Sequence, residues 1–188
     1  MFAFDEMQRK PTKEDLRDAI NRTTDDLIEK DLRLLFCGIN PGLYSGATGL
    51  HFARPGNRFW KALHLSGLTP RQLDPAEEAE LLEMGIGITS FCGRTTARAE
   101  ELTDREYREG GSALIKKVEH YRPSVVAVLG LGAFQKAYGV NKAVVGQQAE
   151  KLAGAELWLL PNPSGLNAHY QLNDFVRLFA ELKDSMQK

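Results

Sequence analysis

Two asparagine–proline pairs are the residues best placed for chemistry, because each directly follows a short apolar run. Asn40 lies in the first, Gly38-Ile-Asn-Pro-Gly42, and Asn162 begins the second, Asn162-Pro-Ser-Gly-Leu-Asn167. An amide side chain can orient a water molecule or a polar ligand, but it cannot serve as a strong general base. Asparagine before proline is also common in ordinary turns, so the pairs alone leave both interpretations open.

Other familiar chemistries lack their residues. The glycine-rich loop is not followed by Gly-Lys-Ser/Thr, and its glycines lack the dinucleotide-binding spacing, which argues against ordinary nucleotide binding. Cys37 and Cys92 lack metal-ligand spacing and cannot form a four-cysteine cluster. His51 and His169 lie in or beside the two loops but match no catalytic pattern. We therefore expect neither a metal nor a cofactor.

Leu166 stands among small polar residues at the expected tip of the second loop. A single exposed leucine needs no explanation. Beside a polynucleotide site, an apolar tip can instead act as a wedge between base steps. Sequence spacing does not choose between these interpretations.

Charge is distributed unevenly along the 188 residues. Lys and Arg total 24 and Asp and Glu total 25, a net charge of −1 that argues against a nucleic-acid partner. Residues 32–73, however, contain five basic and no acidic side chains, between acidic segments at 1–31 and 74–109. An acid-free stretch of this kind is able to face an anion, although chance and burial explain it equally well.

Short apolar runs alternate with helical segments, which predicts an α/β fold: a three-layer αβα sandwich with a mainly parallel central sheet. Strands are expected at residues 32–39, 86–91, 124–129, 147–152 and 156–160, the last two as a hairpin. Helices are expected at about residues 12–29, 57–65, 76–84, 103–121 and 132–138, and in a final segment with Leu172, Phe175, Val176, Phe179 and Leu182 on one face. Residues 40–56 and 161–167 are expected as loops that meet at the carboxyl edge of the sheet, where ligands bind in such folds.

The expected helix at the start of the chain is sparsely apolar and is predicted to lie at the edge of the domain. We expect residues 1–31 to form an N-terminal helical extension and residues 32–188 to form the main domain. Residues 1–10 do not resemble a secretory signal, no stretch is long and apolar enough to span a membrane, and two cysteines fit a reducing compartment. These features predict a cytoplasmic location.

The two loops and the stretch between them resemble the mismatch-specific uracil-DNA glycosylases, the branch of the uracil-DNA glycosylase superfamily that includes thymine-DNA glycosylase. The matching segments are Gly38-Ile-Asn-Pro-Gly-Leu43, Thr48-Gly49, Phe52-Ala53, Pro55-Gly-Asn-Arg-Phe-Trp60 and Asn162-Pro-Ser-Gly-Leu-Asn167. The similarity extends over residues 32–182. It implies the fold of that superfamily and a monomeric DNA-repair enzyme without metal or cofactor. The reaction is hydrolysis of the N-glycosidic bond of uracil, thymine or damaged pyrimidines in G·U or G·T mismatched duplex DNA, leaving an abasic site.

The resemblance also assigns roles around a flipped base. Asn40 would orient the attacking water, Phe52 would stack on the base, and backbone groups of Ile39 and Phe52 would read its polar edge. Asn162 would hold the sugar-phosphate side of the pocket, and Ser45 would contribute to the pocket floor.

The remaining roles concern the DNA around the base. Leu166 would fill the gap left by the flipped base, and Gly165 and Asn167 would face the unpaired guanine. The expected phosphate contacts are Arg54, Arg58 and Lys61. Two positions depart from the pattern of relatives: Gly93 replaces an acidic residue before Arg94, and Ala168 replaces a basic residue after the wedge. Gly93, together with the weak chemistry of the Asn40 amide, keeps a second hypothesis open, a catalytically weak lesion- or mismatch-binding protein.

Overall fold

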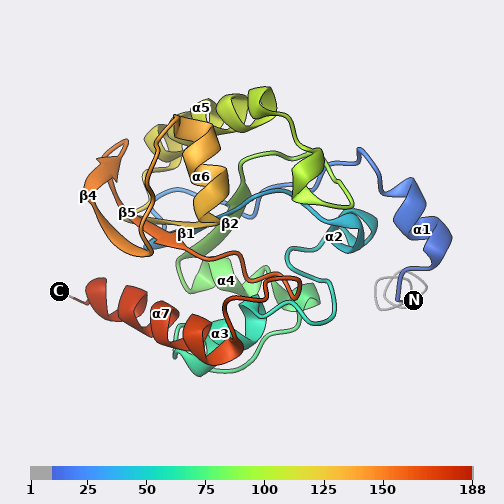
Figure 1. Ribbon diagram of the computed structural model, residues 1–188. Helices are drawn as coiled ribbons and strands as arrows, with labels where there is room; N and C mark the ends of the chain where they lie inside the picture. The colour runs from blue at the N-terminus through green and yellow to red at the C-terminus, as the bar shows by residue number, and fades with distance from the viewer. Residues whose placement is uncertain (1–9, 188) are drawn as a thin grey trace.

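The computed structural model describes residues 10–187, which are built around a five-stranded sheet (Figure 1). The strands are β1 (Leu34–Gly38), β2 (Ile86–Ser90), β3 (Val125–Leu129), β4 (Gly146–Leu152) and β5 (Ala155–Leu160), in the order β2-β1-β3-β5-β4. All neighbouring pairs are parallel except the β4–β5 hairpin at one edge. Every residue of β1 and β3 is buried, as expected for apolar strands covered on both faces.

Helices cover both faces of the sheet (Figure 1). One layer contains α5 (Asp104–Tyr121) and α6 (Leu131–Tyr138), and the other contains α3 (Phe59–Leu65), α4 (Glu80–Glu83) and α7 (Leu172–Ser185). Two further helices, α1 (Lys13–Asp18) and α2 (Leu43–Thr48), lie side by side at one end, and 3-10 turns occupy Pro75–Glu77 and Ala99–Glu101. Two separate clusters of buried apolar side chains, one on each face, confirm the predicted three-layer sandwich. None of the described helices is long and apolar enough to cross a bilayer.

The predicted helix starts at Thr12 and Thr103 are confirmed, and the 3-10 turn at Pro75–Glu77 begins with a similar cap at Asp74. Each side chain caps a backbone N–H, and each has a reciprocal acidic partner three residues later. The predicted passage of α5 through Gly110 is also confirmed. A Cβ at Gly110 would collide with the backbone of Phe91, so the glycine lets the helix lie against the loop that follows β2.

The first helix is much shorter than the predicted 12–29, because it ends at Asp18. The chain then follows the outer edge of β2, where Leu27 exchanges two backbone hydrogen bonds with Ile88, at 2.9 and 2.7 Å. This pairing satisfies the Ile88 backbone groups at the open edge of β2, which would otherwise lack a partner strand. Residues 1–9 of the expected extension lie outside the described residues, and its boundary at residue 31 stays a prediction.

The stretch 40–56 is not wholly a loop, because it contains α2. Gly42 and Gly49 mark the two ends of this helix, and Gly49 has the left-handed φ of 73° that favours glycine after a helix. The helix predicted at 57–65 begins at Phe59, whose N–H is capped by Asn57 Oδ1 at 2.9 Å. The helix predicted at 76–84 is a 3-10 turn followed by the short α4.

Candidate active site

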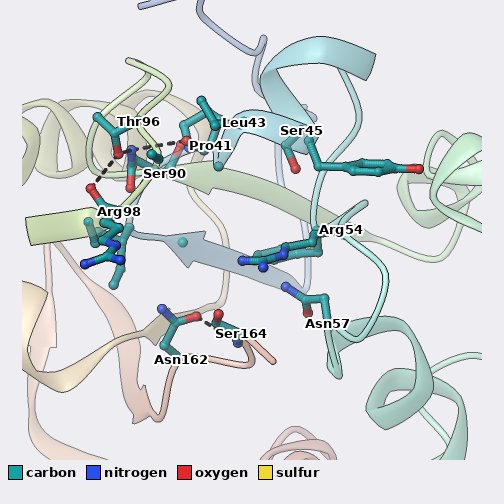
Figure 2. Close-up of a pocket in the computed structure, with 18 of the residues that line it drawn as sticks. Pro41, Leu43, Ser45, Arg54, Asn57, Ser90, Thr96, Arg98, Asn162 and Ser164 are labelled. Atoms are coloured by element: carbon teal, nitrogen blue, oxygen red, sulfur yellow. Dashed lines mark hydrogen bonds between the residues drawn. The ribbon is translucent and has the colours of Figure 1, made fainter. Parts of the chain in front are cut away.

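A cavity of about 820 Å³ lies beyond the carboxyl ends of β1, β2 and β5 (Figure 2). Both predicted loops line it, together with the loop after β2 and two residues of the N-terminal segment, Leu16 and Thr24. The predicted site residues that line this cavity are Ile39, Asn40, Ser45, Phe52, Arg54, Asn162, Leu166 and Asn167. The parallel sheet therefore brings the two asparagine–proline pairs to one place, as the alternation of elements predicted.

The Asn40 side chain is held in one orientation. Its Nδ2 donates to the Thr96 hydroxyl at 2.7 Å, to the Arg94 carbonyl at 2.9 Å and more weakly to the Pro41 carbonyl at 3.2 Å. The Thr96 hydroxyl gives its only hydrogen to the Arg98 carbonyl at 2.8 Å, so towards Asn40 it can only accept. The atom of Asn40 that faces Thr96 must therefore be the donor nitrogen.

The amide oxygen of Asn40 is consequently the atom left for a ligand. No described residue donates a hydrogen bond to this oxygen, and the residue lines the cavity. A carbonyl oxygen in this setting accepts a hydrogen bond from a water molecule. The lone pairs of that water then point away from Asn40, into the cavity. Asn40 can thus orient a nucleophilic water, although it cannot remove a proton at neutral pH.

The loop that holds Asn40 is braced by an ion pair between Arg94 and Glu106. Arg94 Nε and Nη2 donate to the two carboxylate oxygens of Glu106 at 2.7 and 3.1 Å. Glu106 also accepts the Thr103 N–H at the start of α5. The Arg94 guanidinium, followed by the backbone at Thr103, lowers the pKa of Glu106 to about 2. The Glu106 carboxylate stays ionised at any physiological pH. It links the loop whose Arg94 carbonyl holds the Asn40 side chain to the start of α5.

Phe52 forms an aromatic wall of the cavity. Its ring stacks on Phe59 with the centroids 4.1 Å apart and the planes at 28°, and its edge lies against Gly38. The Phe52 backbone has a φ of +51°, a left-handed conformation that costs a bulky residue about 1–3 kcal/mol. Because Phe59 covers one face and Phe52 still lines the cavity, the other face is available to a planar ligand.

The second loop is fastened to the turn before α3. The Arg58 N–H donates to the Pro163 carbonyl at 3.0 Å, and Arg58 Nη1 donates to the carbonyls of Ser164 and Asn167 at 2.8 and 3.2 Å. Gly165 approaches so closely that a Cβ there would lie 2.9 Å from the Gly56 carbonyl oxygen. Arg58 therefore positions the loop, and its contact with phosphate stays a prediction.

The two loop asparagines differ in how much of each amide is free. Asn162 Oδ1 accepts the Ser164 N–H at 3.1 Å, as Figure 2 shows, while no described residue accepts a hydrogen bond from its Nδ2. Asn167 is engaged at both ends, because Nδ2 donates to the Asn162 carbonyl and Oδ1 accepts the N–H groups of His169 and Tyr170. The Asn167 N–H also donates to the Ser164 carbonyl at 2.9 Å, so reading of an opposite strand at Asn167 would fall to its backbone carbonyl, one lone pair of which accepts from Arg58.

The remaining predicted residues differ in exposure. Leu166 is 68% exposed at the tip of its loop. Arg54 is exposed and reaches into the cavity, whereas Ser45 is buried in α2 (Figure 2). Lys61 is exposed on α3 but is not part of the cavity wall. Arg54 and Lys61 are therefore accessible to phosphate groups, and their contact with phosphate stays a prediction.

Two residues of the site, Thr96 and Arg98, were not predicted from the sequence, and His51 was noted beside the first loop but given no role. Thr96 orients Asn40, and Arg98 lies across the cavity from Arg54 (Figure 2). His51 is 9% exposed, and its ring Nδ1 lies 3.1 Å from the Glu78 carboxylate. The adjacency of β2 to β1 would have pointed to Thr96, since loops after neighbouring parallel strands must meet.

Other kinds of chemistry find little support in the described part of the chain. Within residues 10–187 no group of three or more His, Cys, Asp or Glu side chains could hold a metal ion. Burial raises the pKa of the Cys37 thiol far above its usual range, so this cysteine is not a nucleophile. Among the described residues that line the cavity, Glu100 is the one with a carboxylate. The guanidinium groups of Arg54 and Arg98 line the same cavity.

The sequence model of one known family, the Uracil DNA glycosylase superfamily, matches residues 26–183. The match covers more than half of the chain. It includes both loops of the cavity, the residues Arg94 and Thr96 that hold Asn40, and the aromatic wall at Phe52. The fold agrees, since a mainly parallel α/β sheet carries the cavity at its carboxyl edge. The chain therefore belongs to the uracil DNA glycosylase superfamily.

Proposed function

We propose that this chain is a monofunctional DNA glycosylase that removes uracil, and also thymine or damaged pyrimidines, from mismatched duplex DNA. The observation that carries the proposal is the orientation of Asn40. Its amide nitrogen is held by Thr96, Arg94 and Pro41, and its oxygen is left for a water molecule beside the aromatic wall. DNA glycosylase chemistry on uracil is the activity of the superfamily to which the chain belongs.

The reaction would begin with the target nucleotide flipped out of the duplex, because its glycosidic bond is unreachable inside the base stack. The free face of Phe52 would stack on the base, and the backbone at Ile39 and Phe52 would pair with its polar edge. The C1′–N1 bond then breaks, the base leaves with the electron pair, and an oxocarbenium-like sugar remains. Water oriented by Asn40 Oδ1 adds to C1′ and loses a proton to solvent or to the departing base.

The charges around the cavity fit this reaction. The departing pyrimidine carries a negative charge, which nearby cations and backbone N–H groups stabilise. Arg54 and Arg98 lie on the cavity wall, and the first loop and α2 contain no acidic side chain. Because Asn40 is only an amide, chemistry by this route is slow compared with enzymes that use a carboxylate base.

Action on mismatches is supported by the second loop. Leu166, exposed at the loop tip, would occupy the gap left by the flipped base. Gly165 and the backbone of Asn167 would then face the unpaired guanine of the opposite strand. The fastening of this loop by Arg58 holds Leu166 at a fixed distance from the base pocket.

One assay tests the proposal. End-labelled duplexes containing G·U, G·T, A·U or only normal pairs are incubated with the protein and then treated with alkali, which breaks the strand at abasic sites. We expect breakage at the uracil of G·U, slower breakage at the thymine of G·T, and none with the Asn40→Ala variant. Undiminished breakage by Asn40→Ala would remove the assigned role of this residue.

The second candidate is a catalytically weak protein that binds lesions or mismatches. Gly93 favours it, since no side chain stands at the position before Arg94, where the resemblance leads us to expect an acidic residue in some relatives. This alternative predicts a shift of G·U or abasic duplexes in gels without strand breakage after alkali. The duplex assay therefore separates the two functions directly.

A further inference from the structure

We propose that Glu78 is the residue that sets Phe52 in its base-stacking position, acting through His51. Phe52 is the aromatic wall of the cavity, yet its left-handed backbone, with φ at +51°, is a conformation that an aromatic residue does not hold unaided. Something in the surrounding structure must fix it. The proposal rests on the proposed glycosylase function and names a positioning residue for the same site.

The residue before Phe52 is held at three points. Glu78 Oε2 accepts the His51 backbone N–H at 2.8 Å and also lies 3.1 Å from His51 Nδ1. On the other side, Trp60 Nε1 donates to the His51 carbonyl at 3.1 Å. The peptide that enters Phe52 therefore cannot rotate without breaking a hydrogen bond in a region where water is scarce.

Burial makes these contacts matter. His51 is 9% exposed, Trp60 is 5% exposed and the Glu78 side chain is 14% exposed. An unpaired backbone N–H at such a site is costly, so the carboxylate does more than contact the His51 ring. The Glu78 carboxylate accepts the His51 N–H and thereby favours the left-handed turn at Phe52.

Glu78 also differs from its acidic neighbours. Glu77 and Glu80, in the same segment, are turned to solvent and pair with Arg71 at 2.9 and 2.8 Å. Glu78 alone of these three turns inward to the cavity wall at His51. The acidic segment thus contributes one carboxylate to the architecture of an otherwise acid-poor site.

The ring position follows from the backbone. The Phe52 ring packs between Phe59 and Gly38 while its backbone has the left-handed φ. If the His51 peptide relaxes to an ordinary φ at Phe52, the ring leaves Phe59 and the flipped base loses its platform. Loss of Glu78 should therefore have the same consequence as loss of the Phe52 ring.

A double-mutant cycle tests this dependence. Single-turnover cleavage of a G·U duplex and affinity for that duplex are measured for Glu78→Ala, Phe52→Ala and the double variant, with Glu80→Ala as the matched control. We expect Glu78→Ala to slow cleavage about tenfold and the double variant to be no slower than Phe52→Ala, within about twofold. The control should cleave at the wild-type rate.

Additive losses in the cycle would overturn the inference, since they would show that Glu78 acts independently of Phe52. Where Glu78→Ala does not fold, as judged by its thermal transition, Glu78→Met, which fills similar space without an acceptor for the His51 N–H, enters the same cycle with the same expectation. His51→Ala gives a second test: it keeps the backbone bond to Glu78, so it should slow cleavage less than Glu78→Ala. A wild-type protein that does not cleave contradicts the proposed function instead, and the affinity arm of the cycle then still decides the role of Glu78.

Discussion

The Asn40 amide nitrogen donates a 2.7 Å hydrogen bond to the Thr96 hydroxyl, which in turn donates to the Arg98 carbonyl. This chain of bonds has a direction, because the hydroxyl has a single hydrogen. It presents the amide oxygen to the cavity without any titratable group. Orientation of the proposed water-binding atom therefore depends on a buried side chain of the neighbouring loop.

Replacing Thr96 by valine should slow cleavage while leaving DNA binding intact. Valine has nearly the same shape, but it offers no acceptor to Asn40, so the amide nitrogen loses the shortest of its three hydrogen bonds and the amide can turn more easily. We expect the single-turnover rate on a G·U duplex to fall about tenfold, equivalent to about 1.4 kcal/mol. The affinity for an uncleaved duplex should change less than twofold.

Thr96→Ser is the matched control, because serine keeps the hydroxyl and should retain most of the rate. A Thr96→Val variant that loses affinity rather than rate would contradict the orienting role.

Glu106→Gln should lower thermal stability in a way that depends on pH. The folded pKa of Glu106 is about 2, below its usual value of about 4.3, so ionisation favours the folded state. This contribution is complete above the unfolded pKa and is lost as pH falls from about 4.3 toward 2. Glutamine can keep the capping bond to Thr103, so the variant isolates the ion pair with Arg94.

We expect Glu106→Gln to lower the Tm by about 2–4 °C above pH 5, corresponding to about 1 kcal/mol for a partly exposed pair in a chain of this size. The difference should shrink below pH 4.3 in thermal melts. A Tm difference that stays constant down to pH 3 would show that Arg94 and Glu106 are not coupled in this way.

The sequence predicted much of the fold because its signals are local. Apolar runs ended by turn residues mark β1, β2, β3 and β5, and capping side chains such as Thr103 mark helix starts. The convergence of Asn40 and Asn162 followed from one further rule, that parallel strands end at a common edge. The helix at Leu43–Thr48 was missed because its flanking glycines are equally typical of a loop.

The missing parts depend on which segments become neighbours. Residues near Leu27 pair with the edge of β2, and no periodicity in the chain indicates that this edge is open. Thr96 supports Asn40 across 56 positions of sequence. Glu78 turns inward while Glu80 turns outward, a difference that charge patterning does not record. Such contacts are set by packing, not by local propensity.

Leu166→Ala should weaken retention of the abasic product. Leu166 is 68% exposed in the free protein, so the free energy of burying this side chain is gained only when it enters the DNA stack. At about 0.8 kcal/mol for each buried CH₂, loss of three carbons costs up to about 2.4 kcal/mol, so truncation should reduce affinity for abasic duplex by up to about 60-fold. Leu65→Ala is the control, since Leu65 is similarly exposed at 55% but does not line the cavity. Equal affinities for the Leu166→Ala and Leu65→Ala variants would argue against a wedge.

Arg54 and Arg98 should each carry part of the salt dependence of DNA binding. Both are exposed on the cavity wall, and no described carboxylate forms an ion pair with either guanidinium, so both are free to meet the phosphates beside a flipped nucleotide. Each phosphate contact contributes about 0.9 to the slope of log affinity against log salt concentration, so Arg54→Ala and Arg98→Ala should each reduce the slope by about that amount.

Arg105→Ala is the control, because Arg105 is exposed but paired with Glu109 at 2.7 Å. Binding isotherms on a G·U duplex at several salt concentrations measure the slopes. A reduction of the same size in the Arg105→Ala control would mean that net charge, and not contact at the cavity, determines the salt response.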